Sequence, residues 1–173
     1  MTQHAGQAAW IRTVLEEHEQ PLLRYAVRLT GSIELARDVV QDTFLRLLRE
    51  DRATVEGHLR QWLFTVCRHR CIDLGRKEAR MHTVDPDTMN RQTPAGNSAE
   101  PGKHDEVLHA VGMLSDRQQE ILRLRFQAGL SYQEISAVTG LSVSNVGFHL
   151  HTAVKELRGR MTPDKSPADR EAT

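Results

Sequence analysis

The sequence predicts an all-α protein made of two small helical domains that a flexible linker joins. Apolar residues recur at spacings of three and four over most of the chain, which is the period of an amphipathic helix. No stretch alternates with the two-residue period of a strand. The segment from Met81 to Lys103 contains three prolines and two glycines but almost no large apolar residue. Because such a segment cannot bury a core, it predicts a linker.

The expected front domain covers residues 1–80 and is helical throughout. Its helices show an apolar stripe at every third or fourth position, and Ser32 follows a Thr-Gly break that ends one helix and caps the next. In chain order we expect a helix over 10–18, a second that Pro21 starts or kinks, a third over 32–50, a polar loop over 51–57, and a longer helix over 58–80.

The expected C-terminal domain covers residues 105–161, after a linker over 81–104 and before a polar tail over 162–173. Three helix starts are visible in it: Ser115 with Gln118, Ser131 with Glu134, and Ser142 with Asn145. The first two fit the capping box, and the third keeps the capping serine with a weaker partner. A short turn over 139–141, with Gly140 free to take positive φ, separates the last two helices. This spacing predicts a helix-turn-helix.

The last of these helices has two distinct faces. Apolar residues line one of them: Val143, Val146, Leu150, Val154 and Leu157. The other carries Ser144, Asn145, Phe148, His149, Thr152 and Lys155. Polar side chains of these types bond to base edges, and Lys155, Arg158 and Arg160 suit phosphates, so the helix is predicted to bind DNA. The alternative is an ordinary surface helix of a three-helix bundle.

Composition limits the other possibilities. Lys and Arg number 23, as do Asp and Glu, so the formal net charge is zero and a dedicated nucleic-acid coat is excluded. Charge is local instead: the segment 58–80 is basic and the N-terminal part is acidic, which suggests a protein partner as well as DNA. With no run of about 18 apolar residues and no secretory signal, we expect no membrane insertion and a cytoplasmic protein.

An enzyme is a further alternative, because the chain has nine histidines that a nuclease or metal hydrolase could use. His149 and His151 are two residues apart, however, and point to different sides of a helix. No phosphate-cradling glycine loop, HExxH or nucleophile motif occurs. We therefore expect no catalytic residue, cofactor, metal or small-molecule substrate. Cys67 and Cys71 continue an apolar helical series and are predicted to be core residues, with a metal site or thiol switch as the alternative.

Two segments of the front domain resemble a known family. SIELARDVVQDTFLRLLRE and HLRQWLFTVCRHRCIDLGRKEAR are similar to the second conserved region of bacterial sigma factors, and LSDRQQEILRLRFQAGLSYQEISAVTGLSVSNVGFHLHTAVKELR is similar to their fourth region. Two such regions with a short linker resemble the extracytoplasmic-function class. The resemblance implies a protein that binds core RNA polymerase, recognises promoter DNA at the minus-35 and minus-ten elements, helps to open it, and is held inactive by an anti-sigma factor.

The resemblance assigns a role to each surface. The family's polymerase-docking segment matches the helix that carries Asp38, Gln41, Asp42, Leu45 and Arg46. The same residues fall near one another on a helix surface, where acidic and amide groups suit a basic partner and Leu45 could be an apolar anchor; a solvated face is the alternative. The minus-ten element matches the helix with Thr65, Arg68, His69, Arg70, Asp73, Arg76, Lys77 and Arg80. There we expect His69 and Asp73 to contact bases, the basic residues to contact phosphates, and Trp62 or Phe64 to stack on bases if they are not core.

The minus-35 element matches Ser142, Ser144, Asn145, Phe148, His149, Thr152, Lys155 and Arg158. Relatives place more basic residues here, so we expect weak, little salt-dependent DNA binding by this domain alone. Gly147 marks either a close approach to DNA or simple tolerance, and Phe148 either a thymine-methyl contact or part of an interface with a regulator. A helix-turn-helix regulator with an N-terminal interaction domain would explain the C-terminal domain equally well, but not the basic helix beside an acidic one.

Overall fold

A computed structural model of the chain describes the backbone of residues 2–81 and 103–161, and the side chains of 6–77 and 106–161. Within these residues every regular element is helical, as the sequence predicts. Most of the predicted linker and the whole predicted tail lie outside the described residues. No helix in the described part of the chain is both long and apolar enough to span a membrane.

The elements follow one another through two blocks of the chain. The front block contains α1 (Thr2–Thr30), α2 (Ile33–Leu47), the short α3 (Arg52–Val55), a 3-10 turn η1 (Glu56–His58) and α4 (Leu59–Met81). The C-terminal block contains α5 (Lys103–Gly112), α6 (Asp116–Leu122), a π-helical turn η2 (Arg123–Gln127), α7 (Tyr132–Thr139) and α8 (Val143–Met161).

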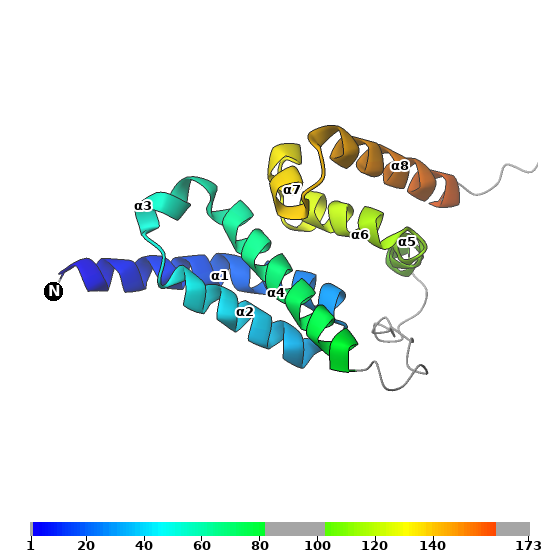
Figure 1. The fold of residues 1–173 in the computed structure, drawn as a ribbon. Coiled ribbons are helices and arrows are strands. Elements are labelled where there is room, and N and C mark those ends of the chain that lie inside the picture. Colours follow the sequence, from blue (N-terminus) through cyan, green and yellow to red (C-terminus); the bar gives the residue numbers. More distant parts are fainter. Residues whose placement is uncertain (1, 82–102, 162–173) are drawn as a thin grey trace, which may run out of the picture.

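The front block is a three-helix bundle of α1, α2 and α4, with α3 at one end (Figure 1). Its core is built from the apolar stripes that the sequence shows, including Leu22, Val39, Leu47 and Leu63 at 0–1% exposure. Phe64 joins this core and meets the ring of Tyr25 edge to face at 5.3 Å between centroids. These contacts hold α2 and α4 in a fixed relation, so the outward faces of the two helices lie next to each other.

Two details of the front block differ from the expectation. The helix over 10–18 and the one expected after it are a single helix, α1, which runs through Pro21. The polar loop expected over 51–57 is wrong, because α3 and η1 fill most of it. Asp51 caps α3 by accepting a hydrogen bond from the backbone of Ala53, and Val55 is buried at 1% exposure. A local cap and one apolar residue in the core therefore accompany the helical turn of this segment.

The C-terminal block begins its helices where the serines predict. Ser115 and Ser131 both form complete capping boxes, and Ser142 accepts the backbone hydrogen bond of Asn145. Gly140 ends α7 with φ at +75°, which confirms the glycine turn of the helix-turn-helix. Val146 and Leu150 are buried as expected, but Val143 is 44% exposed, so its assignment to the apolar stripe is wrong. Val143 is the first residue of α8, where the chain has only just turned away from α7.

The two blocks pack against each other. The C-terminal block lies along one side of the front bundle, with α6 and α7 nearest to α4 (Figure 1). Buried apolar residues of the two blocks belong to one continuous cluster, which includes Leu63 on one side and Ile121 on the other. The two blocks are therefore in contact, an arrangement that we call the closed form, and the residues between them are buried.

Candidate nucleic-acid interface

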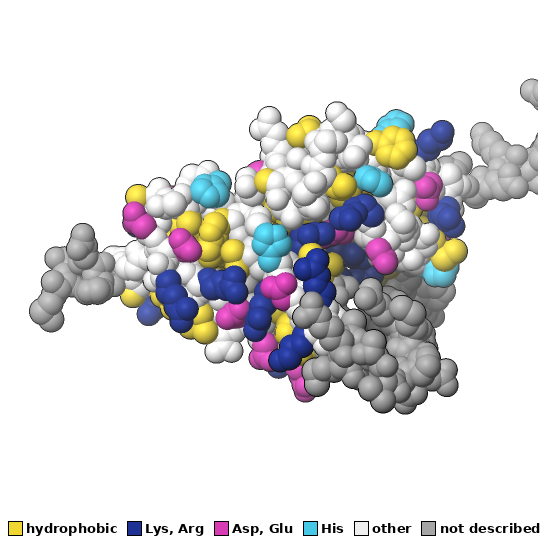
Figure 2. Space-filling view, in the orientation of Figure 1, with side chains coloured by type: hydrophobic (Ala, Val, Ile, Leu, Met, Phe, Trp, Pro, Cys, Tyr) yellow, Lys and Arg dark blue, Asp and Glu magenta, His cyan; other side chains and the backbone are white. Residues whose placement is uncertain are grey.

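The outward face of α4 carries most of the side chains expected at the minus-ten element. His69, Asp73, Arg76 and Lys77 are all exposed. Thr65 is half-buried and its hydroxyl donates a 2.8 Å hydrogen bond to the carbonyl of Gln61, so it is turned back onto its own helix. The side chain of Arg80 lies outside the described residues. Lys and Arg side chains gather along this helix and near its contact with the C-terminal block (Figure 2).

Two arginines of the same set are held by carboxylates. Arg70 forms an ion pair with Asp42 of α2 at 3.1 Å, and Asp42 also lies 3.7 Å from Arg46. Arg68 is almost withdrawn from solvent, with 15% of its side chain exposed, and its Nε lies 2.8 Å from Glu120 of α6. Four of the α4 side chains expected to meet DNA are therefore exposed, namely His69, Asp73, Arg76 and Lys77. Two others, Arg68 and Arg70, form ion pairs with carboxylates.

The two aromatic residues of α4 differ in their exposure. Phe64 is 1% exposed, so the expectation that it could stack on a base is wrong. It is enclosed because it faces α1, where Tyr25 meets its ring. Trp62 is half-buried and packs against the core, which agrees with a structural role.

The outward face of α2 combines polar and apolar groups. Asp38, Gln41 and Arg46 are exposed and Asp42 is partly exposed, as the docking assignment requires. Leu45 is 46% exposed, and Leu48, three residues further along, is 52% exposed. Two exposed leucines near the end of one helix are compatible with an apolar contact to a partner, as the docking assignment expects.

The face of α8 that was expected to meet DNA is open. Ser142, Ser144, Asn145, Lys155 and Arg158 are exposed, and His149 and Thr152 are half-buried. Phe148 is 65% exposed and touches the ring of His149 edge to face, with 5.7 Å between centroids. The half-buried Gly147 faces α7 rather than this surface, since a Cβ there would lie 3.7 Å from the ring of Tyr132.

A cluster of charged and polar groups joins the two blocks, and sequence reasoning missed it. Glu120, at 7% exposure, accepts hydrogen bonds from the hydroxyl of Tyr25 at 2.9 Å, from Arg68 at 2.8 Å and from Arg117 at 3.2 Å. Burial, and then the nearby Glu120 carboxylate, raises the pKa of Tyr25 well above its ordinary value. In the sequence, Gln118, Gln119 and Glu120 read as the polar side of a helix, and nothing distinguishes them from solvated residues.

Comparison with known proteins identifies both blocks. Residues 14–81 match sigma-70 region 2, and residues 104–157 match sigma-70, region 4. The chain is 34% identical over 160 residues to the ECF RNA polymerase sigma factor SigL of Mycobacterium tuberculosis, which covers 89% of this chain and 90% of that protein. The chain belongs to the ECF sigma factor family. It is also 30% identical to the RNA polymerase sigma factor YlaC of Bacillus subtilis, over 90% of this chain and 94% of that one.

Solved structures support the fold of this sigma factor. The sigma factor RpoE of Bartonella quintana, in complex with the anti-sigma factor NepR, matches with a TM-score of 0.66 at 24% identity, over 89% of this chain and 98% of that one. CnrH, in complex with the cytosolic domain of CnrY, matches with a TM-score of 0.57 at 24% identity, over 86% of this chain and 85% of that one. The arrangement of helices is thus shared with sigma factors of known structure.

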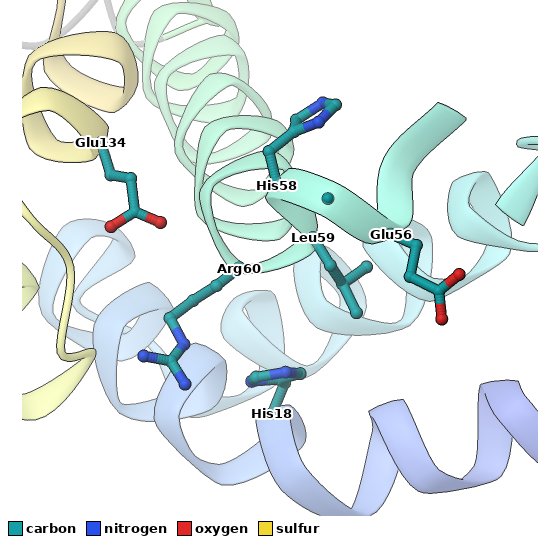
Figure 3. A pocket seen from close by; sticks show the side chains of 7 residues that line it. His18, Glu56, His58, Leu59, Arg60 and Glu134 are labelled. Carbon is teal, nitrogen blue, oxygen red and sulfur yellow. The ribbon is translucent and has the colours of Figure 1, made fainter. Parts of the chain in front are cut away.

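A shallow polar depression lies where the two blocks of the sigma factor meet. It is lined by His18 of α1, by Glu56 and His58, by Arg60 of α4 and by Glu134 of α7. The guanidinium of Arg60 lies between the ring of His18 and the carboxylate of Glu134 (Figure 3). Burial, and then the positive charge of Arg60, lowers the pKa of His18 below its ordinary value.

The two cysteines of the sigma factor lie inside the front block. Cys67 is 0% and Cys71 is 4% exposed, which confirms that both are core positions. Hydrogen bonding with Cys71, together with burial, raises the pKa of Cys67, so this thiol stays protonated. Among the described residues, no group of three or more histidine, cysteine or carboxylate side chains is placed to hold a metal ion.

Proposed function

We propose that this sigma factor binds core RNA polymerase through α2, recognises the minus-ten element with α4 and the minus-35 element with α8, and promotes DNA opening at the promoter. One observation carries the proposal. In a chain of this family, the three surfaces that the mechanism needs lie on separate helices, and the polar, basic and apolar groups on them are largely exposed. The function is binding and strand opening, without catalytic chemistry of its own, in the cytoplasm where the polymerase acts.

The polymerase-docking surface is the outward face of α2. Exposed Leu45 is the apolar anchor at its centre, and the acidic and amide groups of Asp38, Gln41 and Asp42 suit a basic partner. The Asp42 carboxylate already pairs with Arg70 of α4. This partly exposed ion pair links the docking helix to the helix that meets DNA.

The minus-ten surface is the outward face of α4. Opening a promoter requires groups that hold an unstacked base and positive charge along the exposed strand. His69 and Asp73 have the hydrogen-bonding groups to contact a base, and Thr65 lies one turn before them. The phosphate contacts fall to the basic residues around them: Arg68, Arg70, Arg76, Lys77 and Arg80.

The minus-35 surface is the exposed face of α8. Asn145, His149 and Thr152 can bond base edges, while Ser142 and Ser144 lie at the helix start, which enters the groove first in a helix-turn-helix. Phe148 is open enough to contact a thymine methyl group. Lys155 and Arg158 supply phosphate contacts. Two basic residues are few, so polymerase and the front block share the work of holding DNA.

An anti-sigma factor is the expected regulator. RpoE of Bartonella quintana and CnrH, which share this fold, were each solved with a partner protein, NepR and the cytosolic domain of CnrY. We propose that a protein of this kind also holds the present sigma factor inactive. The exposed apolar residues of α2 and α8, among them Leu45 and Phe148, are where such a partner would compete with polymerase or DNA.

Run-off transcription with core RNA polymerase and a promoter library tests the proposal. The full chain should direct specific initiation, and His69→Ala and Arg76→Ala should each lower it about tenfold, since one good base or phosphate contact contributes on the order of 1–3 kcal/mol. Arg12→Ala, which removes an exposed arginine of α1, is the matched control. Specific initiation that neither α4 variant weakens would overturn the minus-ten assignment.

A helix-turn-helix regulator with an N-terminal interaction domain is the alternative. It predicts DNA binding by α8 without any affinity for core polymerase. Pull-down of purified core polymerase by the full chain separates the two functions, because the regulator has no use for the exposed apolar face of α2. No retention of core polymerase would favour the regulator.

A further inference from the structure

One buried carboxylate lies at the contact between the two blocks, beside the shared apolar cluster. Glu120 of α6 accepts hydrogen bonds from Tyr25 of α1 and Arg68 of α4, and from Arg117 of its own helix. A carboxylate withdrawn from water is tolerated when such donors satisfy it. Two of the three donors come from the other block. If the blocks separated, Glu120 would lose its hydrogen bonds to Tyr25 and Arg68 and would be hydrated instead. The Glu120 carboxylate therefore favours the arrangement in which the two blocks are in contact.

A second group of cations lies beside this carboxylate and acts against closure. The side-chain oxygen of Gln119 accepts hydrogen bonds from Arg123 at 2.8 Å and, more weakly, from Arg28 of α1 at 3.5 Å. Two guanidinium groups from opposite blocks therefore converge on one amide. Burial, and then the nearby Arg28, lowers the pKa of Arg123 to about 10. Repulsion between these arginines therefore opposes part of the attraction at this contact.

The closed arrangement affects the three functional surfaces unequally. Arg68, one of the residues assigned to minus-ten DNA, is paired with Glu120 and has 15% of its side chain exposed. The docking face of α2 and the reading face of α8 stay open, as the exposure of Leu45 and Phe148 shows. Polymerase can thus bind the closed chain, whereas a DNA strand that follows α4 cannot reach Arg68 until Glu120 releases it.

We propose that Glu120 is an intramolecular latch that holds the free sigma factor in a closed form and withholds Arg68 from promoter DNA. The proposal rests on the assignment of α4 to the minus-ten element. In the closed form the carboxylate takes the place of a DNA phosphate on Arg68, since both are anions that a guanidinium binds through charge-assisted hydrogen bonds. Opening exposes the arginine and leaves Glu120 in water.

Two substitutions weaken the latch without removing bulk from the interface. Glu120→Gln keeps the length of the side chain and removes its charge, and Tyr25→Phe removes one hydroxyl while the ring stays against Phe64. Each has a matched control. Glu16→Gln removes one negative charge from the exposed surface of α1, and Tyr132→Phe removes the hydroxyl of an exposed tyrosine of α7.

The test measures shape and DNA binding of the free chain. Small-angle X-ray scattering should show a larger radius of gyration for Glu120→Gln and a smaller increase for Tyr25→Phe, with neither control changed. Affinity for a fluorescein-labelled, mixed-sequence single-stranded DNA should rise about tenfold for Glu120→Gln, because apparent affinity is reduced by the fraction of molecules that are competent to bind. Glu16→Gln corrects for the general effect of one lost negative charge.

Arg68→Ala distinguishes a latch from a general loosening. It removes the partner of Glu120 and the proposed phosphate contact together, so it should expand the chain without any gain in DNA affinity. A cooperative thermal transition in each variant establishes that it is folded. If folded Glu120→Gln and Tyr25→Phe match the wild type in both radius and DNA affinity, the latch proposal is overturned.

Run-off transcription separates this proposal from the proposed function. With saturating core polymerase, wild type and Glu120→Gln should initiate equally well, because polymerase binding has already opened the chain. Failure of the wild type to initiate would contradict the proposed function, whatever the latch variants do. Initiation by the wild type, with no change of radius of gyration or DNA affinity in the variants, would contradict only the latch proposal.

Discussion

Gly147 shows how the surroundings of one residue decide its role. A Cβ at this position would lie 3.7 Å from Cε2 of Tyr132, which is an ordinary van der Waals contact. Because glycine inside a helix costs up to about 1 kcal/mol relative to alanine, we expect Gly147→Ala to raise the free energy of unfolding by about 0.5–1 kcal/mol. Urea denaturation followed by circular dichroism measures it. Gly140→Ala is the contrast, since φ of +75° there opposes a side chain and should make it destabilising.

The same variant also tests why this position in α8 is a glycine. Because a Cβ at Gly147 would face Tyr132 of α7, the alanine variant should bind the minus-35 element as tightly as the wild type, and a loss of affinity would show a close approach of the α8 backbone to DNA. Unchanged affinity for that element will show that the glycine is simply tolerated, as the contact with Tyr132 allows.

His18 makes stability depend on pH. Its pKa in the folded chain lies below the ordinary value of 6.5, mainly because of burial and then because of the charge of Arg60. The unfolded chain therefore takes up a proton that the folded chain resists, so this residue lowers stability as the pH falls through 6.5. We expect the free energy of unfolding to drop between neutral pH and pH 5.5 or thereabouts, and to drop less in His18→Asn. Equal pH dependence in the two proteins would contradict this cause.

Among whole elements, the helix-turn-helix depends most visibly on its caps. Ser131 accepts the backbone hydrogen bond of Glu134 at 3.2 Å, and the Glu134 carboxylate accepts that of Ser131 at 2.7 Å. These bonds satisfy backbone amides that α7 leaves unpaired at its start. With Gly140 at the other end, both limits of this helix are set by local chemistry, and α8 then packs back against α5, α6 and α7.

Removing the cap of α7 should be costly although the serine is exposed. Ser131→Ala is expected to lower the free energy of unfolding by about 1 kcal/mol, because a helix start loses one side-chain acceptor. Ser144→Ala, which changes an exposed serine inside α8, is the control and should change stability by less than about 0.5 kcal/mol. Thermal or urea unfolding of both variants provides the comparison. Equal free energies of unfolding in the two variants would contradict the predicted contribution of the Ser131 cap.

For the molecule as a whole, the contact between the blocks pairs Arg68 of the α4 surface with Glu120 and leaves the face of α2 exposed. The outward face of α2 lies away from the contact with α6 and α7, and its Leu45 is 46% exposed. If α2 docks on polymerase and Glu120 acts as a latch, as proposed, the free sigma factor would bind polymerase before Arg68 becomes available to DNA.

Leu45→Ala should weaken binding to core polymerase while the free energy of unfolding changes little. Truncation of an apolar anchor at the centre of an interface costs about 1–2 kcal/mol, or roughly tenfold in affinity, so core polymerase should bind this variant about tenfold less tightly. Leu108→Ala removes a leucine of similar exposure from α5 and should leave the affinity unchanged. Fluorescence anisotropy with labelled sigma factor measures both, and equal affinities would contradict the docking assignment.

Local chemistry in the sequence determined the helices, most of their ends and their apolar faces. Serine caps, the left-handed Gly140 and residue spacing act over a few neighbours, so they can be read without a fold. The same spacing predicted Cys67 and Cys71 in the core. It failed for the segment 51–57, which is helical and buries Val55, and for Val143, which is left exposed at the start of α8.

Only the tertiary structure decided which functional residues are available. Spacing alone groups Arg68 with Arg76 and places Phe64 among possible base contacts, yet Arg68 is paired with Glu120 and Phe64 is enclosed by Tyr25. Partners that are 39 to 95 positions apart in the sequence leave no periodic signal: 52 residues separate Arg68 from Glu120 and 95 separate Tyr25 from Glu120. Phe64 is buried because α1 packs on α4, and Arg68 is paired because the two blocks meet; both contacts exist only in the folded chain.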